Sequence, residues 1–146
     1  MTRAEYGGGC ICGAVRYRMA GTPRPVVACH CRECRVMSGH FMAATQVDRA
    51  DLTIEGAENL TWFRATAYAD RGFCRTCGSH LFFQPVGDER ISVFAGSLDN
   101  PTGLKLAGHI YVAEKGDYYT ISADLPWRSE GAVADILQES RSGETA

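Results

Sequence analysis

The cysteines of this chain lie in three clusters, and their spacing constrains the fold more than any other feature of the sequence. All seven belong to these clusters, which are Cys10/Cys12, Cys29/Cys31/Cys34 and Cys74/Cys77. A tetrahedral zinc site needs four ligands, and two short-spaced pairs supply four thiolates with little strain, whereas the triplet supplies only three. A closed site stabilises a fold, and a site with three protein ligands leaves one position for water or substrate. The count therefore predicts one structural and one catalytic zinc.

The spacing of the cysteines also bears on the compartment. An odd number of cysteines one or two residues apart is unsuited to a disulfide framework. Residues 1–6 include an acidic side chain and lead into glycines, so they do not resemble a secretory signal. No apolar run approaches the roughly 20 residues of a membrane span. We therefore expect a soluble protein with no membrane partner, in the cytoplasm of a bacterium or eukaryote.

Length and composition favour one globular domain over residues 1–146. A chain of 146 residues can bury about two thirds of its unfolded surface. With 45% hydrophobic and 22% charged residues the chain is not disordered, and 16 glycines favour a turn-rich β architecture. The net charge of -2 gives no support for a nucleic-acid partner.

Most segments between the clusters have the pattern of β-strands. Residues 14–19 alternate apolar and polar side chains, which is the period of a strand with one buried face. Further strands are expected at 26–28, 41–47, 52–55, 60–64, 90–95 and 109–113, and a zinc-ribbon hairpin around Cys74 and Cys77 brings the total to about seven or eight. A helical turn is expected after Cys31, only 132–137 has a longer helical pattern, and 140–146 is expected to be a frayed polar tail. The fold class predicted is all-β with at most one short C-terminal helix.

The four cysteines Cys10, Cys12, Cys74 and Cys77 are predicted to form one structural zinc site. Glycines flank the first pair and Gly78 follows the second, which allows each loop to turn tightly around an ion. The two pairs are about sixty residues apart, so the ion would close a long loop. The alternative interpretation is buried free thiols or a redox pair, which two short-spaced pairs make less favourable.

The triplet Cys29, Cys31 and Cys34 admits two interpretations. A histidine could complete the site and make it a second structural zinc; the candidates are His30, His40, His80 and His109. Because His30 stands between two ligands, we expect its side chain to point away from the metal. The other interpretation leaves the fourth position open for water or for a substrate thiolate, which a sulfur-rich zinc site favours.

Charged residues near the triplet are further candidates for a role at the zinc site. Three thiolates and Zn²⁺ leave one net negative charge, which Arg32 and Arg35 are placed to offset. The same guanidinium groups could bind the carboxylates of a peptide-like thiol, although arginines on a solvated face are an equally simple interpretation. Glu33 and Asp99 are the acid/base candidates.

The order and spacing of the cysteine motifs resemble the glutathione-dependent formaldehyde-activating (GFA) family, which also includes centromere protein V. The motifs are G-G-C-I-C-G at residues 8–13, C-H-C-R-E-C at 29–34 and F-C-R-T-C-G-S-H-L-F at 73–82. Weaker downstream similarities are G-S-L-D at 96–99, H-I-Y-V at 109–112 and Pro126-Trp127. The resemblance covers about residues 6–128.

The resemblance implies a β-tent fold of antiparallel sheets with two zinc ions. It places the structural zinc on Cys10, Cys12, Cys74 and Cys77 and the catalytic zinc on Cys29, Cys31 and Cys34. It also implies a carbon-sulfur lyase that joins a small thiol such as glutathione to formaldehyde, giving S-hydroxymethylglutathione, or catalyses the reverse reaction. No basic cluster dedicated to the two carboxylates of glutathione stands out, and a His80 turned toward the triplet would close it. The alternative function is therefore a non-enzymatic two-zinc binding module.

Overall fold

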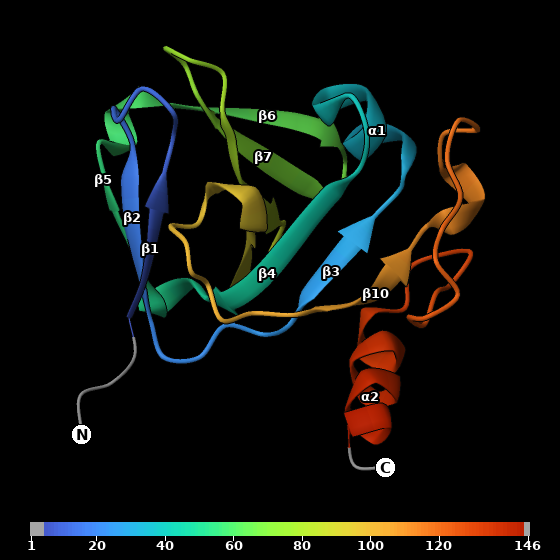
Figure 1. Ribbon diagram of the computed structural model, residues 1–146. Helices are drawn as coiled ribbons and strands as arrows, with labels where there is room; N and C mark the ends of the chain where they lie inside the picture. Colours follow the sequence, from blue (N-terminus) through green and yellow to red (C-terminus); the bar gives the residue numbers. More distant parts are fainter. Residues whose placement is uncertain (1–4, 145–146) are drawn as a thin grey trace. The chain divides into compact units, whose positions relative to one another are not determined.

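The computed structural model describes residues 5–144, which fold into two compact units. The first unit contains residues 5–24 and 45–103, and the second contains residues 25–44 and 104–144. Ten strands are assigned to a three-stranded and a seven-stranded sheet, and two α-helices complete the described fold (Figure 1). No helix between residues 5 and 144 is both long and apolar enough to cross a membrane.

A three-stranded antiparallel sheet opens the first unit. Its strands are β1 (Glu5–Gly9), β2 (Arg16–Ala20) and β5 (Leu52–Glu55), with β2 in the middle (Figure 1). Tyr17 and Met19 on β2 are buried, as the alternating sequence predicts. Strand β1 was not expected, because it ends in three glycines. Its Gly8 lies so close to the Ser97 carbonyl and the Tyr17 hydroxyl that a Cβ would not fit, which explains the glycine at this position.

The larger sheet of the first unit contains four strands in the order β9, β8, β7 and β6. Their bounds are Arg90–Phe94, His80–Pro85, Ala69–Cys74 and Leu60–Thr66, and neighbouring strands are antiparallel. Phe82 on β8 is fully buried, with the Tyr17 ring at its edge and the Trp62 ring stacked 6.2 Å away. Short 3-10 turns lie at Arg49–Asp51, Ala57–Asn59 and Ala95–Ser97. The β7–β8 hairpin thereby presents Cys74 and Cys77 at one of its ends.

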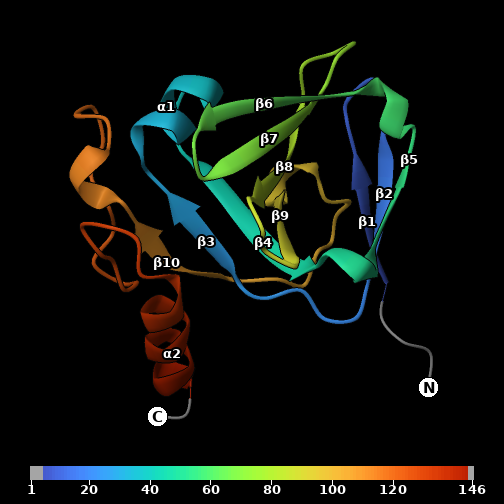
Figure 2. The same cartoon turned by 180° about the vertical axis from the view of Figure 1, so that it is seen from behind.

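The second unit is built around strand β3 (Val26–Cys29). Strand β3 pairs antiparallel with the beginning of β4 (Met42–Asp48) and parallel with β10 (Leu106–Ile110). The short helix α1 (Arg32–Ser38) follows β3 directly and ends at Gly39, whose φ of 87° is left-handed. Helix α2 (Val133–Glu144) lies against β10 (Figure 2), where Ile136 is buried among Val27, Ala107 and Ile110. A 3-10 turn at Val112–Glu114 completes the unit.

The predicted all-β class is confirmed, with a few differences of detail. The described chain has ten strands rather than seven or eight, and one pair, β3–β10, is parallel. The helical turn expected after Cys31 is present as α1. Helix α2 continues through residues 140–144, where the frayed tail was expected to begin, and it packs against β10 through Ile136 in its first turns. The start of the segment at 1–6 and the end of that tail lie outside the described residues.

Candidate metal centres

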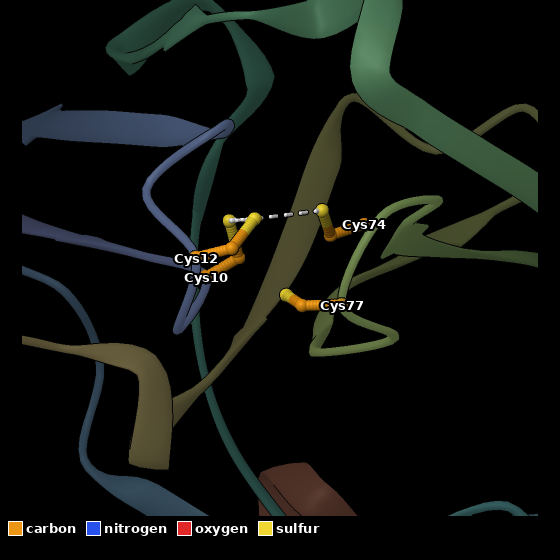
Figure 3. A group of neighbouring side chains, drawn as sticks. All are labelled: Cys10, Cys12, Cys74 and Cys77. Carbon is orange, nitrogen blue, oxygen red and sulfur yellow. Dashed lines mark hydrogen bonds between the residues drawn. The ribbon is translucent and has the colours of Figure 1, made fainter.

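Four cysteines converge within the first unit, as the sequence predicts. Cys10 and Cys12 lie on the loop after β1, Cys74 ends β7, and Cys77 lies in the turn before β8. Figure 3 shows the side chains of the two loops directed toward one another. All four Sγ atoms lie within 4.8 Å of one another, with Cys10 and Cys12 3.6 Å apart and Cys12 and Cys74 3.7 Å apart. We call this group the four-cysteine cluster.

Both loops of the four-cysteine cluster owe their shape to a left-handed glycine. Gly13 has a φ of 83° and its N–H donates to the Cys10 carbonyl; Gly78 has a φ of 79° and its N–H donates to the Cys74 carbonyl. Residues with a Cβ rarely adopt this backbone conformation. The N–H of Val15 also donates to the Cys10 sulfur at 3.2 Å. The two loops therefore turn the sulfurs toward a common centre, and the Val15 amide partly compensates the negative charge of the Cys10 sulfur when it is ionised.

Ser79 links the two loops, and the sequence analysis did not identify it. Its hydroxyl lies 3.2 Å from the Cys77 sulfur, to which it can donate, and it accepts the N–H of Ile11 at 3.1 Å. Ile11 stands between Cys10 and Cys12, so one hydroxyl connects a ligand of one pair with the backbone of the other. The only sequence signal was a hydroxyl residue two positions after Cys77.

The electrostatics of the four-cysteine cluster fit a bound cation. The Ser79 hydroxyl, followed by its backbone amide, lowers the pKa of Cys77 to about 5. A backbone hydrogen bond from Ala14 favours the Cys12 thiolate, but partial desolvation and the neighbouring thiols outweigh it and raise the pKa of Cys12 to about 12. Ionising one thiol thus opposes ionising the next, and a divalent cation removes that opposition. Four sulfur donors in this arrangement are the donor set of a closed structural zinc site.

The cysteine triplet lies in the second unit, where β3 meets α1. Cys29 ends β3, Cys31 caps the N-terminus of α1 and Cys34 is buried one turn into the helix. The three Sγ atoms lie within 4.8 Å of one another, and the Cys31 sulfur accepts the Cys34 N–H at 3.4 Å. The thiols of Cys31 and Cys34, together with burial, raise the pKa of Cys29. The donor set fits a soft cation but supplies one ligand fewer than a closed site requires.

No histidine joins the triplet among the residues that the structure describes. The ring nitrogens of His30 instead lie 2.5 Å from the Tyr119 hydroxyl and 2.9 Å from His109 Nδ1, and burial lowers the pKa of His30 to about 4. Exposed His40 pairs with the Tyr118 hydroxyl at 2.7 Å. His80 belongs to the first unit, where its ring faces Phe73. The described geometry therefore assembles three cysteines without the histidine that the closed interpretation required.

The side chains of Arg35 and Asp99 have partners outside the triplet. Arg35 Nε donates to the Glu114 carbonyl at 2.9 Å, and the backbone N–H of Arg32 donates to the Glu114 carboxylate at 3.0 Å. Asp99 belongs to the first unit, where Arg16 binds both of its carboxylate oxygens and lowers its pKa. Glu33 lies half-buried in the first turn of α1. Glu114 thus holds α1 in place, a role that the sequence did not reveal.

A comparison with known protein families agrees with the cysteine motifs. The family model described as glutathione-dependent formaldehyde-activating enzyme matches residues 5–114. The chain belongs to this GFA family. The matched GFA range includes both cysteine groups and Glu114 but ends before helix α2. The family resemblance drawn from the three cysteine motifs is therefore confirmed.

Two individual proteins are also similar to this chain, one in sequence and one in structure. An uncharacterized lyase of Schizosaccharomyces pombe is 31% identical over 80 residues, which are 54% of this chain and 57% of that relative. The chain therefore matches little more than half of the relative's length. A crystal structure of a Rhodobacter sphaeroides protein is 25% identical, covers 84% of this chain and 99% of its own, and superposes with a TM-score of 0.55.

Proposed function

We propose that this GFA-family protein is a zinc-dependent carbon-sulfur lyase or synthase acting on the adduct of a small thiol and an aldehyde. Glutathione and formaldehyde, giving S-hydroxymethylglutathione, are the substrates that the family description favours. The observation that carries the proposal is the cysteine triplet, three converging sulfurs with no histidine among the described residues. The name of the lyase from Schizosaccharomyces pombe is consistent with this class of reaction.

The protein's own residues would divide the work between two zinc sites. Cys10, Cys12, Cys74 and Cys77 would hold the structural ion, and the triplet would hold the catalytic one. Zinc at the triplet would favour the ionised form of a substrate thiol at neutral pH. The reaction forms one carbon-sulfur bond to the carbonyl carbon and transfers the thiol proton to the carbonyl oxygen; the reverse reaction releases the aldehyde.

Three features of the described chain support the catalytic role of the triplet. Strand β3 carries Cys29, helix α1 carries Cys34 and Cys31 is the N-cap between them, and such regular structure positions ligands more accurately than a loop. Glu114 fixes the first turn of α1 through Arg32 and Arg35. All seven cysteines are free of disulfides, so the three thiols of the triplet are available as metal ligands.

A two-zinc binding module is the second candidate, and one observation favours it. Trp62 and Phe63 are 41% and 52% exposed on β6, which lies at the end of its sheet. Exposed aromatic side chains on an edge strand are a common feature of protein-binding surfaces. This module would use both zinc ions for stability alone.

Zinc-edge X-ray absorption of the zinc-loaded protein distinguishes the two functions. The lyase proposal predicts two zinc ions per chain and an increase in mean sulfur coordination when glutathione is added, because a substrate sulfur would complete the triplet site. S-methylglutathione, which has no free thiol, is the matched control and should leave the spectrum unchanged. Glutathione and formaldehyde also combine without a catalyst. Exchange NMR should therefore show that they interconvert with S-hydroxymethylglutathione faster when the protein is present. A single zinc per chain would contradict the catalytic site, and a two-zinc spectrum that glutathione does not alter would favour the module.

A further inference from the structure

His30 lies between two cysteines of the triplet, but its side chain binds elsewhere. The ring is 1% exposed, with Nδ1 2.5 Å from the Tyr119 hydroxyl and Nε2 2.9 Å from His109 Nδ1. Its backbone N–H donates to the Ile110 carbonyl at 3.0 Å. A neutral imidazole has one donor and one acceptor nitrogen, so both are used in either tautomer. The residue between Cys29 and Cys31 is therefore anchored at three points.

The partners of His30 are themselves held in place. His109 lies on β10, where its N–H donates to the Pro126 carbonyl and its carbonyl accepts the Arg128 N–H, both at 3.0 Å. Lys115 Nζ donates to the Tyr119 carbonyl and lies 4.8 Å from the centre of the Tyr119 ring. Hydrogen bonds from an anchored side chain restrict the backbone to which that side chain belongs.

We propose that Tyr119 and His109 are positioning residues of the cysteine triplet, which they orient by holding His30. This inference rests on the proposed role of the triplet as a zinc site. Cys29 and Cys31 are the immediate sequence neighbours of His30, so a shift of the residue that the ring contacts anchor would move the backbone that carries both sulfurs. Groups hydrogen-bonded directly to metal ligands change metal affinity about tenfold to a hundredfold in proteins. Tyr119 and His109 act one residue further out, so we expect an effect at the lower end of this range.

Tyr119 has a matched control in the preceding residue, Tyr118. Tyr119→Phe removes the hydroxyl beside His30 Nδ1 and leaves that buried nitrogen without its partner. Tyr118→Phe removes a hydroxyl that binds the exposed His40 instead, at 2.7 Å. The four-cysteine cluster belongs to the other unit and has its own contacts. A positioning role therefore predicts an effect of Tyr119→Phe at the triplet alone.

Chelator competition with the zinc-loaded full-length protein tests the inference. Wild-type protein should release zinc in two steps, and Cys34→Ser, which removes a triplet ligand, identifies the step that belongs to the triplet. Tyr119→Phe should weaken zinc binding in that step by about tenfold, the lower end of the range for groups bonded directly to ligands. The other step and the melting temperature should stay close to wild type, and Tyr118→Phe should change neither step.

Other results would overturn the inference. It is wrong if Tyr119→Phe leaves the triplet step unchanged, weakens both steps equally, or acts no more strongly than Tyr118→Phe. If Tyr119→Phe does not fold, His109→Leu and His109→Asn decide: only the leucine variant should weaken the triplet step, because asparagine can keep the hydrogen bond to His30 Nε2. A wild-type protein with one zinc and no triplet step would instead contradict the proposed function, and the inference with it. A wild-type protein that releases zinc in two steps but does not accelerate the reaction would contradict the proposed function alone.

Discussion

Replacing Ser79 by alanine should weaken the four-cysteine cluster selectively. The Ser79 hydroxyl makes two hydrogen bonds, one with the Cys77 sulfur at 3.2 Å and one with the Ile11 N–H at 3.1 Å. A partly exposed hydrogen bond contributes about 0.5–1 kcal/mol, so the loss of both amounts to about 1–2 kcal/mol. Since 1.4 kcal/mol corresponds to a factor of ten, zinc affinity at this site should fall roughly fivefold to thirtyfold. Two control substitutions are available nearby. Ser79→Thr keeps the hydroxyl, and Thr76→Ala removes an exposed hydroxyl from the same turn.

The pH dependence of Cys77 provides a second measurement on the Ser79→Ala variant. In the metal-free protein the pKa of Cys77 is lowered to about 5 from an ordinary value of 9.0, with the Ser79 hydroxyl as the largest cause. A group whose pKa is lower in the folded state stabilises the fold fully above its unfolded pKa, and this contribution is lost as the pH falls from about 9 toward 5. Ser79→Ala should raise the pKa of Cys77 in the folded protein, so the loss of this stabilisation should be complete at a higher pH than in the wild type.

Two assays check the prediction for Ser79. Chelator competition measures the zinc affinity of each site, and the ultraviolet absorbance of the thiolate in metal-free protein follows the ionisation of Cys77. An unchanged affinity together with an unchanged Cys77 titration would refute the role assigned to the hydroxyl. An equal loss at the triplet would show that the substitution acts through general stability.

Two further predictions concern the division of labour between the sites and the backbone beside the first loop. Cys34→Ser should abolish lyase activity, and circular dichroism should show that this variant is folded. Cys77→Ser should instead lower the melting temperature. Equal unfolding of both variants would contradict the assignment of a structural and a catalytic site. Gly87→Ala, at a φ of 76° with no atom near the added Cβ, should lower the free energy of unfolding by about 1–2 kcal/mol in urea denaturation. Gly56→Ala, at a φ of 78°, should lower it further, because the added Cβ would collide with the Ala14 carbonyl. Equal losses for the two glycine variants would show that this collision is relieved at little cost.

The amino-acid sequence by itself determined the two cysteine groups and most strands. Ligand spacing is a local property, because Cys31 and Cys34 face the same side of one helical turn whatever surrounds them. Left-handed glycines such as Gly78 mark their turns in the same local way. Alternation on residues 14–19 likewise predicted which side chains of β2 are buried. The family resemblance used the same short motifs.

Only the tertiary structure decided which residues surround those ligands. Ser79 reaches Ile11 across 68 positions of the sequence, and His30 reaches His109 and Tyr119 across 79 and 89 positions. Strand β1 exists because Gly8 allows the chain to pass close to Ser97 and Tyr17. Such contacts depend on which strands pair and in which register. The side-chain pattern of a strand predicts which of its faces is buried, but it does not predict which strand lies beside it. The sequence therefore identified the two cysteine groups, and the fold identified the residues that contact them and their neighbours.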